Sequence, residues 1–331
     1  MCEYIQICIP AFLKSHQNKK LYLAGGLEPR DTVFYITAES AFREHALNCN
    51  HTDADTRLIF HVKQIQSREV QESPIIVESP DTDVFILLLS HYTFFCHLPK
   101  IYFYTGRVVG MVNKKRYIPI HIIFEKIGSS LASALSAAHA ITGCDTTCAF
   151  FYIGKSKMYA ALKKMSNLDL EKLSLMHTSP FADALMIASE FVALLYDPIK
   201  KSKAIRTDIN SLRYCLSLEK NICIDKLPPS KPAFEQHLKR VIWQMNSWSQ
   251  ATEALFIDRD PKEFGWIEEN NILQPNYFEG ENAMDYLDKY FCACKGSKAC
   301  STESCPCTNM NLQCCSVCHC TEKCANKDYP E

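Results

Sequence analysis

The chain has 331 residues, 47% of them hydrophobic, so it can bury one sizeable core and carry smaller modules beside it. Its formal net charge of −1 excludes a global basic field of the kind that attracts nucleic acid. No stretch approaches the ~20 apolar residues of a membrane span. The first residues, with Glu3 and Pro10, form a poor secretory signal. The sequence therefore predicts no membrane partner and a reducing compartment.

Short strands alternate with helices from about residue 20 to residue 165. We predict strands at 33–37, 74–79 and 101–104, and helices at 51–66, 83–92, about 120–128 and 130–141. This alternation favours an α/β fold with a parallel sheet flanked by helices. Further helices are predicted at 181–196, 211–218 and 232–247. The predicted organisation is an α/β domain at 1–165, a helical extension at 166–250, a mostly irregular linker at 251–291 and a cysteine-rich module at 292–326.

Five aspartates lie at junctions between these elements. Asp53 and Asp55 open a helix, Asp81 and Asp83 lie where a buried strand meets a helix, and Asp145 ends a Gly-Cys-Asp loop. Ligands of α/β sheets bind beyond the carboxyl ends of the strands, and Mg²⁺ and Mn²⁺ prefer oxygen ligands. Two such ions can clamp the attacking and leaving oxygens of a phosphodiester. The alternative is that each aspartate only caps a helix.

The order of these motifs, followed by Ile153-Gly154-Lys155, resembles the flap-endonuclease branch of the PIN-like nucleases. In that family an E-x-E helix, a D-x-D strand end and a G-C-D loop hold metals, and a G-I-G-x-K turn grips the DNA backbone. The resemblance implies a Mg²⁺ or Mn²⁺ site and a nucleic-acid substrate. It places Asp53 and Asp55 in the first motif, Asp81 and Asp83 in the second and Asp145 in the third. Asp81, Asp83 and Asp145 would be the catalytic core, and Gly154 and Lys155 would contact the nucleic-acid backbone.

The chain departs from this family in two places. Tyr152 stands where the backbone-gripping turn has its first glycine. The family also has a metal-binding aspartate after its first strand, and no residue before Asp53 fits, since Asp31 lies in a turn-like stretch. We therefore expect either an N-terminally truncated copy or an inactive one. Two functions stay open: a metal-dependent nuclease, and a non-catalytic protein that binds nucleic acid or protein.

Three other kinds of residue are weaker candidates for the site. His139 precedes the Gly-Cys-Asp loop in an alanine-rich helix, and we expect it to be structural. Cys144 has no evident His/Asp partners, so we do not expect a cysteine nucleophile. Trp243, Trp248 and Trp266 are predicted to be core or anchor residues rather than platforms for bases.

Ten of the eighteen cysteines lie in the last 40 residues. Leaving Cys315 aside, nine remain, with C-x-C occurring three times. Three tetrahedral zinc ions need twelve ligand positions, which nine thiolates fill if three of them bridge. A disulfide framework is the alternative, but it needs an oxidising compartment. We therefore predict about three zinc ions on the nine cysteines, which are Cys292, Cys294, Cys300, Cys305, Cys307, Cys314, Cys318, Cys320 and Cys324.

This cysteine pattern resembles the tesmin-like CXC domain and, more loosely, the pre-SET zinc cluster. Ser304 stands where the CXC family usually has a tyrosine used on DNA, and only one repeat is present instead of two. The resemblance to the CXC family therefore implies metal binding by this chain more strongly than it implies DNA binding. The motifs Ser79-Pro80-Asp81-Thr82-Asp83-Val84 and Thr142-Gly143-Cys144-Asp145 also resemble a group of animal proteins that join a PIN-like domain to a CXC-like cluster. The resemblance implies a nuclear location, with the cytoplasm as the alternative.

Overall fold

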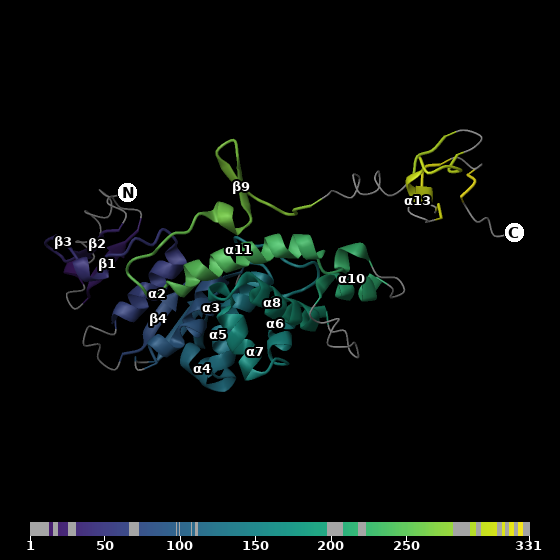
Figure 1. Ribbon diagram of the computed structural model, residues 1–331. Helices are drawn as coiled ribbons and strands as arrows, with labels where there is room; N and C mark the ends of the chain where they lie inside the picture. The colour runs from purple at the N-terminus through teal and green to yellow at the C-terminus, as the bar shows by residue number, and fades with distance from the viewer. Residues whose placement is uncertain are drawn as a thin grey trace. The chain divides into compact units, whose positions relative to one another are not determined.

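The structure is a computed structural model of the chain (Figure 1), which divides into two compact units, Met1–Tyr277 and Phe278–Glu331. It describes residues 13–15, 19–25, 31–65, 73–96, 98, 100–106, 108–109, 112–196, 208–217, 223–280, 292–295, 299–309, 313–314, 318–320 and 324–326. Residues 1–12 and 16–18, next to the expected N-terminal truncation, lie outside these residues. So do residues 281–291 of the predicted linker and Cys315.

The first half of the first unit contains every strand of its central sheet. Its helices and strands are, in chain order, β1 (Leu21–Ala24), β2 (Val33–Ile36), β3 (Ala41–Arg43), η1 (His45–Leu47), α2 (Ala54–Ile65), β4 (Ile75–Glu78), α3 (Thr82–Ser90), η2 (Tyr92–Phe94), β5 (Ile101–Thr105), β6 (Val108–Val109), β7 (Val112–Asn113), β8 (Arg116–Pro119), α4 (Ile120–Ile127) and α5 (Ser129–Ile141). The strands and helices predicted for this half are confirmed within a few residues at their ends.

The second half is mostly helical. It consists of α6 (Lys155–Leu162), α7 (Asn167–Ser174), η3 (Met176–Thr178), α8 (Phe181–Tyr196), α10 (Ile209–Ser217), η4 (Ile224–Lys226), α11 (Lys231–Ser249), η5 (Pro261–Phe264), β9 (Trp266–Glu269) and β10 (Ile272–Pro275). The three helices predicted here correspond to α8, α10 and α11. The helix α7 is not among the predicted helices. Ser166 is its N-cap and accepts a hydrogen bond from the Asp169 N–H at 3.2 Å.

The central sheet is small and mixed. Its strand order is β4-β5-β8, with β4 parallel to β5 and β8 antiparallel to β5. A separate antiparallel sheet has the order β1-β2-β3, and β6-β7 and β9-β10 are hairpins. The fold is thus mixed α/β, and one of the two pairings in its central sheet is the parallel pairing that we predicted. The chain passes directly from the carboxyl end of β4 at Glu78 to the start of α3 at Thr82.

The core of the first unit is aliphatic and joins the sheet to the helices. On α3, Val84, Leu87 and Leu88 are fully buried, and burial of one leucine contributes roughly 1.5–3 kcal/mol. The helix α5 is rich in buried alanines, and these small side chains let α3, α7 and α11 pack closely against it. In Figure 1, α11 is the long green helix, and it contacts both α5 and α8.

Residues 251–277, which fall within the predicted linker, belong to the first unit. The buried Arg240 of α11 donates a hydrogen bond to the Gly265 carbonyl at 3.0 Å and another to the Asn276 carbonyl, so it holds both ends of the β9-β10 hairpin. The segment between α11 and η5 also folds back onto the start of α2, since the Asn50 N–H donates to the Ala254 carbonyl at 3.3 Å.

The second unit has a different composition. Its one helix among the described residues is the short α13 (Pro306–Asn309), and its buried cluster consists of cysteines and Ala299. In the part of the chain that the structure describes, no helix is both long enough and apolar enough to cross a membrane.

Candidate metal centres

The first pair of aspartates lies at the start of α2. Asp53 accepts a hydrogen bond from the Asp55 N–H at 3.2 Å, so it caps the helix as the alternative interpretation expected. The preceding loop is held by Arg57, whose guanidinium donates to the His51 carbonyl at 3.2 Å from Nε. Asp53 is exposed and Asp55 is half-buried. Capping one helix does not remove either carboxylate from the site, because a carboxylate offers about four lone-pair positions.

The second pair lies between β4 and α3. Asp81 is the N-cap of α3 and accepts from the Asp83 N–H at 2.8 Å, while the Ser79 hydroxyl accepts from the Asp81 N–H at 3.0 Å. Asp83 is buried, and its Oδ1 lies 2.7 Å from Nε2 of His139 on α5. The carboxylate accepts and the imidazole donates. His139, which we expected to be structural, thus orients an aspartate of the site.

The third aspartate, Asp145, follows a tight turn after α5. Gly143 has a φ of +106°, and a Cβ there would lie 2.7 Å from the Ala149 Cα, so only glycine fits. The Thr147 hydroxyl donates to the Ala140 carbonyl at 2.6 Å, and the Thr146 hydroxyl donates to Gln244 of α11 at 2.6 Å. These bonds fix the loop that carries Asp145 against two helices.

The structure brings the five aspartates to one place. The carboxylates of Asp55, Asp81 and Asp83 offer oxygens that lie within 4.8 Å of one another, close enough to hold one metal ion. A cavity of about 210 Å³ opens beside them and is lined by Asp53, Asp55, Asp83 and Asp145, among others. This arrangement is the oxygen-rich environment in which a hard divalent cation binds.

The electrostatics of the cavity act most strongly on Asp55. Burial, as the largest cause, and the neighbouring charges of Asp53, Asp81, Asp83 and Asp145 together raise the pKa of its carboxyl to about 7. At neutral pH the cluster therefore carries unfavourable mutual repulsion. A divalent cation would relieve that repulsion and displace the proton.

The residues assigned to the nucleic-acid backbone lie next to this cavity. Gly154 is the N-cap of α6, and Lys155 is its first residue. The Lys155 ammonium donates to the His139 carbonyl at 3.1 Å, to the Thr142 hydroxyl at 3.2 Å and to the Gly143 carbonyl. The pKa of Lys155 is lowered, because the effect of burial exceeds the opposite effects of Cys144 and Asp83. Lys155 thus neutralises the carboxyl end of α5 in this structure.

Several residues that line the cavity are not among the site residues predicted from the sequence. Trp243, Gln244, Ser247 and Trp248 line it from α11, and Phe256 and Asp258 line it from the segment after that helix. Trp248 is buried beside His139, with ring centroids 6.0 Å apart, as an anchor residue would be. No local pattern marks these positions, because they reach the aspartates only through the packing of α11 against α5.

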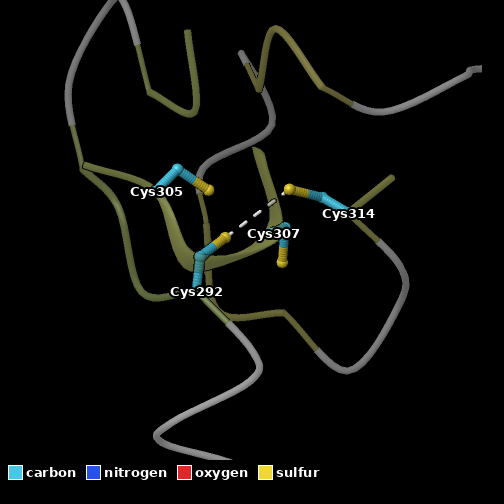
Figure 2. A group of neighbouring side chains, drawn as sticks. All are labelled: Cys292, Cys305, Cys307 and Cys314. Carbon is cyan, nitrogen blue, oxygen red and sulfur yellow. Dashed lines mark hydrogen bonds between the residues drawn. The ribbon is translucent and has the colours of Figure 1, made fainter. Parts of the chain in front are cut away.

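The second unit brings its cysteines together (Figure 2). Three groups of four thiols have sulfurs within 4.8 Å of one another: Cys292/305/307/314, which Figure 2 draws, Cys292/294/300/305 and Cys292/300/314/320. Cys292 belongs to all three groups. The described cysteines form no disulfide with one another, and the Sγ atoms of Cys292 and Cys314 lie 3.6 Å apart. A zinc ion with Zn–S bonds of about 2.3 Å separates its sulfurs by about 3.8 Å, whereas a disulfide needs about 2.05 Å.

Sharing of thiols is the arrangement that we predicted for a multinuclear cluster. Cys300, Cys305 and Cys314 each belong to two of the three groups, so several thiolates could bridge. Cys318 lies beside Cys307, with their sulfurs 3.6 Å apart. Burial raises the pKa of the Cys292 thiol, and Cys300 and Cys314 raise it further, so a metal must supply the charge that stabilises its thiolate. The C-terminal cysteines could hold zinc.

Comparison with known proteins adds no relative. No protein family, no curated protein and no solved structure matches the chain. The resemblance to PIN-like nucleases and to CXC clusters stays a prediction from the motifs.

Proposed function

We propose that the first unit is a nuclease-like hydrolase that needs Mg²⁺ or Mn²⁺ and acts on nucleic-acid phosphodiesters. One observation carries the proposal: carboxylate oxygens of Asp55, Asp81 and Asp83 lie within 4.8 Å of one another, and Asp55 and Asp83 line a cavity that Asp145 also lines. Helix capping alone explains Asp53 and Asp81, but it does not explain why aspartates from three junctions meet. Nor does it explain the raised pKa of Asp55.

The residues of the cavity suit this reaction. When bound, a divalent ion would polarise the phosphate of the substrate and activate the attacking water. Asp55, Asp81 and Asp83 would hold it, and His139 keeps the Asp83 carboxylate in one orientation at 2.7 Å. Trp243, Trp248 and Phe256 line the cavity with apolar surface, which limits water around the reacting group.

We propose that the second unit holds about three zinc ions. The number follows from nine thiolates that fill twelve ligand positions when three of them bridge. The overlap of the groups supports a cluster of more than one ion, because Cys300, Cys305 and Cys314 each belong to two groups and could bridge. The ions would supply most of the folding free energy of this unit, since its described residues bury sulfur and little else.

A non-catalytic protein that binds nucleic acid or protein is the second candidate. The engagement of Lys155 with the carbonyls of His139 and Gly143 favours it, because this ammonium is not directed at a substrate here. In that case the acidic cavity would bind metal without cutting, and the cysteine unit would make the contacts with the partner. Nucleic acid as the partner and a nuclear location remain parts of the proposal.

A cleavage assay separates the two candidates. The full chain is incubated with single-stranded, flapped and hairpin DNA and RNA in Mn²⁺, in Mg²⁺ and in chelator. Under the nuclease proposal, cleavage requires the metal and is lost in Asp83→Asn, which keeps an acceptor for His139. The exposed Asp183→Asn on α8 serves as the control and stays active. Metal binding without cleavage of any substrate would favour the binding protein.

A further inference from the structure

We propose that Asp258 is a sixth carboxylate of the acidic cavity and binds its divalent cation, directly or through a bound water. The inference rests on the proposed metal site and extends it to a segment at the opposite end of the unit's sequence. Asp258 lines the same cavity as Asp53, Asp55, Asp83 and Asp145. It lies in the segment 250–260, between α11 and η5, where the sequence predicts only irregular structure.

The backbone on both sides of Asp258 is held by side chains from fixed elements. Asn50 bonds both polar groups of Phe256: its Oδ1 accepts from the N–H at 2.6 Å and its Nδ2 donates to the carbonyl at 2.8 Å. Gln250 does the same for Ile257, at 2.8 Å and 3.2 Å.

On the far side of Asp258, the Trp243 indole N–H donates to the Arg259 carbonyl at 3.1 Å. Three neighbours of Asp258 are thus fixed by an asparagine, a glutamine and a tryptophan. Support of this kind is typical of a residue whose position matters.

The same segment is bonded to α2 and the loop before it, which carry Asp53 and Asp55. The Lys63 ammonium of α2 donates to the Thr252 carbonyl at 2.9 Å, and Nε2 of His51 donates to the Glu253 carbonyl at 2.7 Å. His51 and Lys63 flank Asp53 and Asp55 along the chain. Asp258 is therefore held in register with the first pair of aspartates, although about 200 residues separate them in sequence.

A second observation points to a ligand in this part of the cavity. His51 lines the cavity and is only 1% exposed, yet its Nδ1 has no hydrogen-bond partner among the described atoms. Because Nε2 donates to Glu253, Nδ1 of the neutral ring carries a lone pair. A buried lone pair without a partner is costly. A water molecule of a hydrated Mg²⁺ or Mn²⁺ would donate to it, since Mg²⁺ usually keeps several waters.

The test is a calorimetric titration of the zinc-loaded full chain with Mn²⁺. Asp258→Asn should weaken Mn²⁺ binding by about tenfold or more, the loss seen when a supporting carboxylate is removed. Asp260→Asn is the matched control: it makes the same change in charge two residues away, outside the cavity lining. Asparagine there can still accept from the Lys262 N–H, as Asp260 does at 3.0 Å. It should bind Mn²⁺ as the wild type does.

A second variant tests the support. Asn50→Ala leaves all six carboxylates in place but releases Phe256, so it should weaken Mn²⁺ binding in the same direction. Unchanged binding in Asn50→Ala would refute the role of the support. Unchanged affinity and stoichiometry in Asp258→Asn, with Mn²⁺ bound by the wild type, would overturn the inference and leave the proposed function standing. A wild type that binds no Mn²⁺ would overturn both.

Discussion

In the first unit the aspartates lie beside a core of aliphatic side chains, whereas in the second unit the cysteines are themselves the buried core. The helices α3 and α5 would pack without the acidic cavity, because Val84, Leu87 and the alanines of α5 are buried whether or not a metal binds. Among its described residues the second unit has no such alternative, since the buried ones are thiols and Ala299.

The two units therefore differ in what supplies the free energy of folding around the site. In the first unit the fold provides free energy that offsets the repulsion among carboxylates. In the second unit the ligands must provide the fold, so metal and structure should be lost together. Removal of a single metal ligand should therefore change the stability of the first unit little, whereas it should unfold the second unit.

The largest effect is expected at Cys292. Because it belongs to all three groups of thiols, Cys292→Ser should abolish the cluster: zinc per chain should fall well below three, and the second unit should lose its structure. Cys96→Ser, an exposed cysteine of the first unit, is the control and should retain the zinc. Metal analysis and proton NMR dispersion measure both. Full zinc content in Cys292→Ser would show that the shared sulfur is not a ligand.

A smaller effect is expected where the fold of the first unit meets its site. Gly143→Ala would place a Cβ 2.7 Å from the Ala149 Cα at a φ of +106°. We expect a loss of about 2–4 kcal/mol in the free energy of unfolding, from backbone strain and overpacking. Gly154→Ala, at φ −89° with open space around its Cβ, should cost under about 1 kcal/mol. Denaturant unfolding compares the two, and equal losses would contradict the geometry of the loop.

The smallest effect concerns pH. The folded-state pKa of Asp55, about 7, exceeds its unfolded value, so the folded state holds the proton more tightly. Between about pH 4 and pH 7 the stability in chelator should therefore fall as pH rises, and it should level off above pH 7. Asp55→Asn should flatten this slope, and so should saturating Mn²⁺. Melting temperatures at pH 5 and pH 8 measure it, and an equally steep slope in Asp55→Asn would contradict the assignment.

The sequence predicted the parts of both sites that are local. Asp81 and Asp83 are recognisable because a strand ends and a helix begins around them, and the cysteines because their spacing repeats. The pairing of β8 with β5 is antiparallel and depends on a short connection through β6 and β7, which the alternation of elements does not reveal.

The remainder of the acidic site could not be found in this way. Phe256 is held at the cavity by hydrogen bonds to Asn50, which lies 206 residues before it, and Asp258 follows Phe256 by two residues. The sequence around them is Leu255-Phe256-Ile257-Asp258-Arg259-Asp260, with no periodicity or motif. Only tertiary packing of α11 and the segment after it gives these residues a position.

The most direct test of the account is equilibrium dialysis of the full chain against Mn²⁺ and Zn²⁺, followed by metal analysis. The wild type should hold about three zinc ions, together with Mn²⁺ that is retained at micromolar free metal. The Asp81→Asn/Asp145→Asn double variant should keep the zinc and lose the Mn²⁺, because the two metals occupy different units. Mn²⁺ retained by the double variant, or absent from the wild type, would contradict the account.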